Sequence, residues 1–197
     1  MKSIDDTLKI IRDITSALPI KIDIVLIGGM AAILHGVERT TIDLDLCVYA
    51  ETDAPVFFDM LVQHLPEQFT ARLVEGSKIP DDSLRHDIIF IDDTEGEYER
   101  IDLLIARYKW EVEGMRRATH TPGVPFPVLG KPYLAAMKLL ASGYKDAYDV
   151  VTLFTLMTAE ERETTRSLAN RIGRDKKLER LLAPPEDIVR EMPEEYL

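Results

Sequence analysis

The stretch that decides the fold runs from Val25 to Val48 and reads VLIGGMAAILHGVERTTIDLDLCV. Its first residues have the β-branched density of a buried strand, which ends at Gly28-Gly29. The segment MAAILH favours a short helix, and Gly36 is a typical helix-terminating residue. Acidic and apolar residues then alternate through TIDLDLCVYA, which is typical of a strand with two different faces. The stretch therefore predicts a strand, a tight turn, a short helix and a second strand.

The rest of the chain predicts an α/β (α+β) protein. The segments DIIFIDD and RIDLLIA are strand-like and are joined by an acidic turn, so residues 87–106 should form a hairpin. From Lys131 onward the pattern is helical, and Thr158 with Glu161 forms a capping-box pattern. We expect a small mixed sheet with helices covering one face, in an α/β lobe over residues 1–120, and a helical C-terminal lobe over residues 121–197.

Composition and charge exclude several classes of protein. The 24 basic and 35 acidic residues give a formal net charge of −11, which argues against a chain that coats nucleic acid or anionic membranes through its overall field. The single cysteine, Cys47, rules out an internal disulfide and a cysteine-rich zinc site. No apolar run approaches the ~20 residues of a membrane span, and the acidic N-terminus is unlike a signal peptide. We therefore expect a cytoplasmic protein without a membrane partner.

Two acidic side chains in the second strand are candidate metal ligands. Residues two apart on a strand point to the same face, so Asp43 and Asp45 should project together while Leu44 and Leu46 point into the core. Their charges repel, and a divalent cation would remove that penalty. Oxygen-only ligands favour magnesium or manganese over zinc. The alternative is an edge strand whose acids simply face water.

The diglycine turn and the loop before the acidic strand are candidate phosphate contacts. Without Cβ atoms, Gly28 and Gly29 let backbone N–H groups approach an anion, although such a pair is also common in an ordinary strand-to-helix turn. Arg39 and Thr40 precede the acidic strand and could touch phosphates, or they could belong to an ordinary loop.

A third carboxylate is available in the strand RIDLLIA. Asp102 lies between Ile101 and Leu103, so it occupies the polar face of an otherwise apolar strand, where an acid without a partner is costly. Asp87, Asp92 and Asp93 are competing candidates, but Asp87 stands at the start of a strand, and Asp92 and Asp93 look like turn residues. We prefer Asp102.

The segment GGMAAILHGVERTTIDLDL, from Gly28 to Leu46, resembles the DNA polymerase beta-like nucleotidyltransferase superfamily, whose signature is a diglycine turn, an acid-x-acid strand and a third acid on a later strand. The helical segment LAAMKLLASGYKDAYDVVTL is similar to the K-L-x-A and K/R-D-x-x-D elements of the same superfamily. The branch that it resembles contains the abortive-infection and type IV toxin-like nucleotidyltransferases. The likeness covers roughly a third of the chain.

The resemblance implies a role for each matching residue. Gly28 and Gly29 would hold the phosphates of a nucleoside triphosphate. Asp43, Asp45 and Asp102 would form the catalytic centre: the first two would ligate two magnesium (or manganese) ions, while Asp102 would complete the metal site and help to deprotonate the attacking hydroxyl. Lys138 would face the triphosphate, although a solvated lysine on an amphipathic helix is an equal alternative.

The resemblance thus implies a magnesium-dependent nucleotidyltransferase that moves a nucleoside monophosphate to a hydroxyl acceptor. The acceptor could be RNA such as a tRNA end, a protein or a small molecule, and a toxin-like member would be paired with an antitoxin. Two other interpretations stay open. The chain could be a non-catalytic nucleotide-binding module of the same fold, or an α/β protein whose motif match is accidental.

Overall fold

The computed structural model describes residues 2–76, 86–141 and 143–183 of the chain. The chain divides into two compact units, Met1–Gly130 and Lys131–Leu197, and each is described by itself. The first unit contains a sheet and four helices among its described residues, and the second unit is helical as far as it is described.

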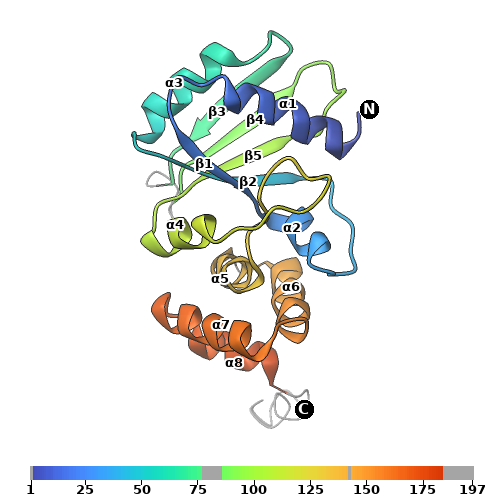
Figure 1. Cartoon of the computed structure of the whole chain (residues 1–197), viewed down its shortest axis with the longest axis vertical. Coiled ribbons are helices and arrows are strands. Elements are labelled where there is room, and N and C mark those ends of the chain that lie inside the picture. Colours follow the sequence, from blue (N-terminus) through green and yellow to red (C-terminus); the bar gives the residue numbers. More distant parts are fainter. Residues whose placement is uncertain (1, 77–85, 142, 184–197) are drawn as a thin grey trace, which may run out of the picture. The chain divides into compact units, whose positions relative to one another are not determined.

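A five-stranded mixed sheet forms the centre of the first unit (Figure 1). The spatial order is β1-β2-β5-β4-β3. Only β2 and β5 run parallel among these strands, and the other three neighbouring pairs are antiparallel. The predicted α/β class with a small mixed sheet is confirmed, as is the antiparallel hairpin within residues 87–106. The strands are β1 (Ile22–Leu26), β2 (Leu44–Ala50), β3 (Phe69–Val74), β4 (Ile88–Asp93) and β5 (Ile101–Ile105).

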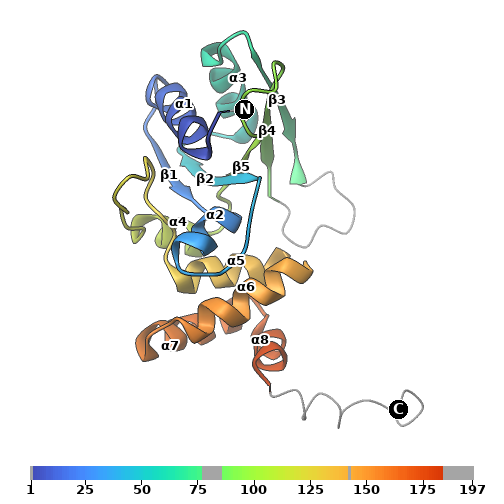
Figure 2. The ribbon, with the colours of Figure 1, turned by 90° about the vertical axis from the view of Figure 1, so that its right-hand side faces the viewer.

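One face of the sheet carries the main apolar core. Alternate residues of the three inner strands point to this face and are at most 1% exposed: Leu44, Leu46, Val48, Ile89, Ile91, Ile101 and Leu103. Helices α1 (Ile4–Ser16) and α3 (Ala54–His64) pack against each other on this side (Figures 1 and 2). Their inward side chains, among them Ile11, Phe57 and Leu61, are also at most 1% exposed. This burial holds the strands in register.

The opposite face is covered over part of its area by α4 (Lys109–Arg116). The Cys47 thiol lies 3.8 Å from the Met115 sulfur, which places α4 against the face that carries the odd-numbered residues of β2. Glu111 is 2% exposed, and its carboxylate accepts bonds from the backbone N–H groups of Arg107 and Tyr108. Its other oxygen lies 2.6 Å from His86 Nε2, so the start of α4 is held by a buried carboxylate.

The segment after α4 belongs to the first unit, because it bonds to the end of β1. Val128 makes isolated bridges with Leu26 and Thr119, and the N–H of Leu26 donates to the Pro127 carbonyl at 2.8 Å. The connection over residues 121–130, which we placed with the helical lobe from the sequence, therefore lies with the sheet, and the boundary between the units falls at Gly130. Short helix α2 (Gly28–Leu34) follows β1 directly.

The described part of the second unit consists of four helices: α5 (Lys131–Ala141), α6 (Tyr144–Thr155), α7 (Ala159–Arg171) and α8 (Asp175–Leu182). The predicted capping box at the start of α7 is confirmed, since Thr158 Oγ1 accepts from the Glu161 N–H at 3.2 Å and the Glu161 carboxylate accepts from the Thr158 N–H at 2.8 Å.

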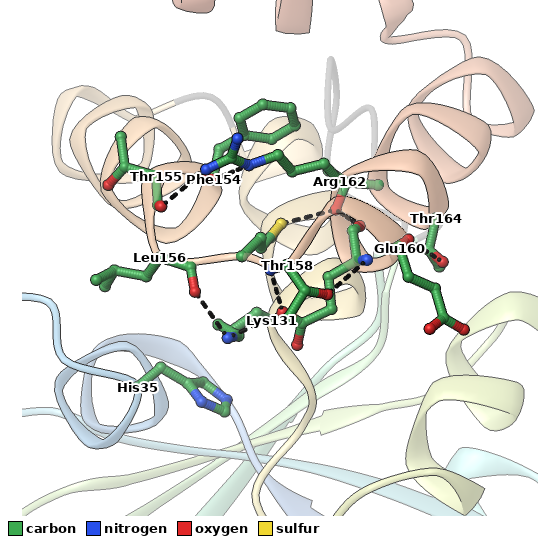
Figure 3. Close-up of polar contacts among 12 residues, drawn as sticks. His35, Lys131, Phe154, Thr155, Leu156, Thr158, Glu160, Arg162 and Thr164 are labelled. Atoms are coloured by element: carbon green, nitrogen blue, oxygen red, sulfur yellow. Dashed lines mark hydrogen bonds and ion pairs between the residues drawn. The ribbon is translucent and has the colours of Figure 1, made fainter.

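Two cationic side chains hold the connection between α6 and α7 (Figure 3). Lys131 donates to the Leu156 carbonyl at 2.9 Å and pairs with Glu161 at 3.0 Å. Arg162 donates to the carbonyls of Phe154 and Thr155, each at 3.0 Å. Positive groups at the C-terminal end of a helix satisfy its last carbonyls and favour its dipole, so these contacts stabilise the end of α6. No helix in the described parts of the chain combines the length and apolarity that a bilayer span requires.

We predict that Cys47 resists alkylation in the folded protein. Its burial, with a smaller contribution from the charge of Glu111, raises the pKa of the thiol well above its usual value, so the reactive thiolate is disfavoured. Iodoacetamide treatment at mildly alkaline pH, followed by intact mass measurement, should show no adduct on native protein and one adduct in concentrated urea. Modification of the native protein at the rate of the unfolded chain would contradict the placement of this side chain.

Candidate active site

The parallel pairing of β2 with β5 places two acidic side chains next to each other. Asp45 and Asp102 are register partners, so their side chains project from the same face on adjacent strands, which are about 4.8 Å apart in any sheet. Both residues are partly buried, and the flanking residues Leu44 and Ile101 point into the core on the other face. The structure thus brings together two of the three carboxylates that the sequence predicted.

Gly28 lies against the carboxylate of Asp45. The backbone of Gly28 has φ +65°, in the left-handed region that side-chain-bearing residues rarely adopt. A Cβ atom at Gly28 would fall on the carboxylate of Asp45, and the preceding residue, Ile27, donates its N–H to the Asp45 carbonyl at 3.0 Å. The diglycine turn is therefore in direct contact with the acidic strand, and glycine is required there for both conformation and space.

The second glycine is enclosed by the loop before β2. A Cβ at Gly29 would meet the guanidinium group of Arg39 and would come within 2.7 Å of Thr41 Oγ1. Arg39 is partly buried beside the turn, whereas Thr40 is exposed. Arg39 therefore lies beside the diglycine turn, and the threonine that lies against the turn is Thr41. A contact of Arg39 or Thr40 with phosphates stays a prediction.

Asp43 lies outside the strand that was expected to carry it. Strand β2 begins at Leu44, so Asp43 stands one residue before the strand on which it was expected to alternate with Asp45. Asp43 is exposed, but it is near enough to Asp102 for its charge to raise the pKa of that carboxyl. Asp43 is therefore a neighbour of the other two acids. Only Asp45 and Asp102 are held in position by pairing between strands.

Asp102 carries an ion pair that the sequence analysis did not name. Arg100 Nε donates to the Asp102 carboxylate at 2.8 Å, and Nη2 lies 3.5 Å from its second oxygen. Desolvation by burial raises the pKa of Asp102, Arg100 acts to lower it, and the charges of Asp43 and Asp92 act to raise it; the net shift is upward. Burial, rather than the neighbouring carboxylates, is the largest cause of this upward shift.

Two of the competing acids, Asp87 and Asp93, accept hydrogen bonds from backbone N–H groups. Asp87 directly precedes β4, and its side chain accepts from the Gly76 N–H at 2.9 Å. Asp93 accepts from three backbone N–H groups of the following turn; although desolvation acts against them, these bonds lower its pKa. Both side chains thus serve the backbone, whereas Asp92 lies close enough to Asp102 for its charge to act to raise the pKa of that carboxyl.

The donor set suits a hard divalent cation, but the described side chains do not surround one. Within residues 2–76, 86–141 and 143–183, no group of three or more His, Cys, Asp or Glu is gathered closely enough to hold a metal ion. The crowding of Asp43, Asp45 and Asp102 is nevertheless what a cation would relieve, and carboxylate oxygens favour magnesium or manganese. Arg100 is the cation that meets Asp102 in this structure.

Lys138 is buried in the second unit, where its ammonium group lies 2.6 Å from Asp149 and 3.3 Å from Asp146. The side chain of Lys138 is 7% exposed and that of Asp149 is 0% exposed, so this lysine is not the solvated residue of the alternative interpretation. Both charges are desolvated, and each needs the other. A contact of Lys138 with a triphosphate stays a prediction.

The sequence contained a signal for the missed arginine. Arg100 and Asp102 are two residues apart in a strand-like run, and such residues share a face. Thr41 carried no comparable signal, because the exact residue of a loop that meets a glycine depends on the path of the chain.

Comparison with known proteins finds similarity of fold. No family model matches the chain, and no curated protein matches it. Among solved structures, it is similar to an antigenic nucleotidyltransferase-like protein from Paracoccidioides brasiliensis, with 17% identity, 91% of each chain covered and a TM-score of 0.48. It is also similar to the antibiotic-resistance factor ANT(2'')-Ia, with 15% identity, 95% of each chain covered and a TM-score of 0.43.

A further similar structure is terminal uridylyl transferase 4 from Trypanosoma brucei with bound dUTP, with 12% identity and a TM-score of 0.44. The similarity covers 83% of this chain and 58% of the transferase, so the chain spans less than two thirds of that protein. At these identities and TM-scores the likeness extends no further than the fold, so the function has to be inferred from the side chains of this chain.

We predict that Gly28→Ala destabilises the protein more than a glycine replacement with the same backbone strain. Gly96 has φ +67°, and a Cβ atom added to it would have no neighbouring atom within 4 Å, so Gly96→Ala should cost only the left-handed strain, about 1–2 kcal/mol. Gly28→Ala adds the collision with Asp45, which should raise the loss by about 1–3 kcal/mol. Urea unfolding of both variants measures the difference, and equal losses would contradict the contact between Gly28 and Asp45.

We also predict that Lys138→Ala lowers the free energy of unfolding by about 3–5 kcal/mol, because it removes the ammonium partner of a fully buried carboxylate. The exposed Lys145 on the next helix is a matched control, and Lys145→Ala should change stability by less than about 0.5 kcal/mol. Urea unfolding followed by circular dichroism makes the comparison. A small effect of Lys138→Ala would show that the ion pair with Asp149 does not hold the helical unit together.

Proposed function

We propose that the protein is a magnesium-dependent nucleotidyltransferase that moves a nucleoside monophosphate from a nucleoside triphosphate to a hydroxyl acceptor. The observation that carries the proposal is the placement of Asp45 beside Asp102 on parallel strands, with Gly28 directly against the Asp45 carboxylate. A backbone without Cβ atoms next to paired carboxylates suits a phosphate chain that arrives with a bound cation.

Each proposed residue has a defined task. The diglycine turn of Gly28 and Gly29 admits the triphosphate close to the backbone, and Arg39 and Thr40 in the loop before β2 contact its phosphates. The acceptor hydroxyl attacks the α-phosphorus, the bond from that phosphorus to the bridging oxygen breaks, and pyrophosphate leaves. Asp102 accepts the hydroxyl proton.

Magnesium, held by Asp43, Asp45 and Asp102, would supply the neutralisation of charge on the phosphoryl and pyrophosphate oxygens. Asp43 is exposed and close to Asp102, so its carboxylate can turn toward a cation without disturbing the core. Release of Asp102 from Arg100 would complete the set of three carboxylate ligands. The ion pair between them is partly exposed, and such pairs contribute little stability, so it can open at small cost.

A second candidate is a non-catalytic nucleotide-binding module, and the same ion pair favours it. Arg100 occupies the Asp102 carboxylate, and no cluster of three ligands is assembled within the described residues. In such a module the arginine would neutralise the acidic pair permanently, and a nucleotide would bind without turnover.

The expectations of a toxin-like role, an antitoxin partner and a cytoplasmic location belong to the same proposal. A toxin-like member of the superfamily would act in the cytoplasm and would be held inactive by an antitoxin partner, with a tRNA end or a protein as the acceptor. Induction of the wild-type chain in a bacterial host, beside Asp45→Asn, tests this role: growth arrest only with the wild type supports it, and normal growth with both removes it.

We predict that Asp45→Asn reduces magnesium-dependent pyrophosphate release by about 100-fold or more, because it removes a carboxylate that would hold the magnesium ion. The assay combines each triphosphate, magnesium and a cell extract that supplies acceptors, and it follows released pyrophosphate and the species that acquires label from the α-phosphate. Chelation with EDTA should abolish both signals. Asp13→Asn, an exposed acid on α1, is the control and should leave them unchanged.

The same assay separates the candidates. Triphosphate binding without pyrophosphate release, in the wild type with every acceptor tried, would support the binding module. Absence of both binding and release would leave neither candidate standing.

A further inference from the structure

Two arginines and a phenylalanine form a patch beside the acidic pair. Phe90 on β4 is the register partner of Asp102, and Arg72 on β3 is the register partner of Phe90. The guanidinium carbons of Arg72 and Arg100 lie 4.7 Å and 4.2 Å from the centroid of the Phe90 ring. These three residues, called here the Arg–Phe patch, continue the row of side chains that begins with Asp45 and Asp102.

The row has a direction across the sheet. Its order is Gly28 at the end of β1, then Asp45 on β2, Asp102 on β5, Phe90 on β4 and Arg72 on β3. The diglycine turn thus lies on one side of the acidic pair and the Arg–Phe patch on the other. If the triphosphate lies over Gly28, the acceptor has to approach Asp102 from the side of the patch, because the reacting groups must meet at the acids.

The chemistry of the patch suits one kind of acceptor. Arg72 and Arg100 are both exposed. Arg72 presents N–H donors that match a phosphate, and the face of each guanidinium group that is turned away from Phe90 is a flat surface on which a nucleobase stacks. Phe90 is partly buried and holds both guanidinium groups by cation–π contact. A nucleotide offers both a phosphate and a planar base to these groups, whereas an unmodified protein acceptor offers no phosphate.

The charges around the patch limit the size of the bound segment. Asp92, two residues after Phe90 on β4, lies close enough to raise the pKa of Asp102, and the chain as a whole carries a net charge of −11. Long-range attraction of a polynucleotide is therefore weak. Two guanidinium groups beside four carboxylates can hold the phosphate of a terminal nucleotide but not an extended backbone.

We propose that the Arg–Phe patch binds the 3′-terminal nucleotide of a single-stranded RNA and presents its hydroxyl to Asp102. This inference rests on the proposed function and names its acceptor. The oxygen of the terminal ribose forms the new bond to the α-phosphorus, its proton passes to Asp102, and pyrophosphate leaves, so the RNA is extended by one nucleotide.

The test measures RNA binding and nucleotide binding separately. A short fluorescent single-stranded oligoribonucleotide with a free 3′ end is titrated with wild-type protein, Arg72→Gln and Phe90→Ala, and a fluorescent triphosphate analogue with magnesium is titrated with the same proteins. Each variant should weaken RNA binding by about tenfold, the order expected for loss of a stacking or phosphate contact. Triphosphate binding should be unchanged. Arg100 is left intact because it also contacts Asp102.

Arg12→Gln is the matched control. Arg12 lies on α1 and its side chain is 47% exposed, so this variant loses the same charge away from the row, and it should bind RNA as the wild type does. Thermal unfolding of each variant confirms that it is folded. Phe90→Leu keeps an apolar side chain without the ring and serves if Phe90→Ala does not fold.

Four results would overturn the inference. None of them would contradict the proposed function, which the triphosphate titration tests separately. These are no RNA binding by the wild type, equal RNA binding by wild type and both variants, equal binding of a circular RNA of the same sequence, and transfer of label to protein but not to RNA. Absence of triphosphate binding by the wild-type protein would instead refute the proposed function itself.

Discussion

The register of the parallel pair β2 and β5 is the constraint on which the candidate site depends. Asp45 faces Asp102 because Leu44 and Leu46 are aligned with Ile101 and Leu103 on the buried face. A slip of β2 by one residue would turn Leu44 and Leu46 out of the core and Asp45 into it. The core therefore determines the position of the carboxylates.

That alignment has an electrostatic cost that the site only partly offsets. Like charges on neighbouring strands are destabilising, and the pKa of Asp102 is raised by its burial and by Asp43 and Asp92 in spite of the ion pair with Arg100. A sheet selected for stability alone would place an apolar or oppositely charged residue at one of these positions. Retention of both acids at a half-buried place is typical of a functional site.

The sequence predicted most of the elements, because each is encoded locally. Alternation of polar and apolar residues predicted the strand carrying Asp102, and the Thr158–Glu161 pair predicted the start of α7. It did not predict that Asp43 precedes β2 or that Lys138 is buried against Asp149, since both depend on contacts between distant segments. The same limit applies to residues 121–130, whose bonds to Leu26 assign them to the sheet.

The two contacts of Arg100 do not compete with each other. A guanidinium group is planar, with its N–H donors in the plane and its polarizable surface above and below it. Arg100 uses the edge of this plane, through Nε, for Asp102 and the face for the ring of Phe90. Asp102 on the one side and the aromatic ring on the other therefore fix the orientation of one side chain. The acidic pair and the Arg–Phe patch are for this reason adjacent in space and meet at one side chain, that of Arg100.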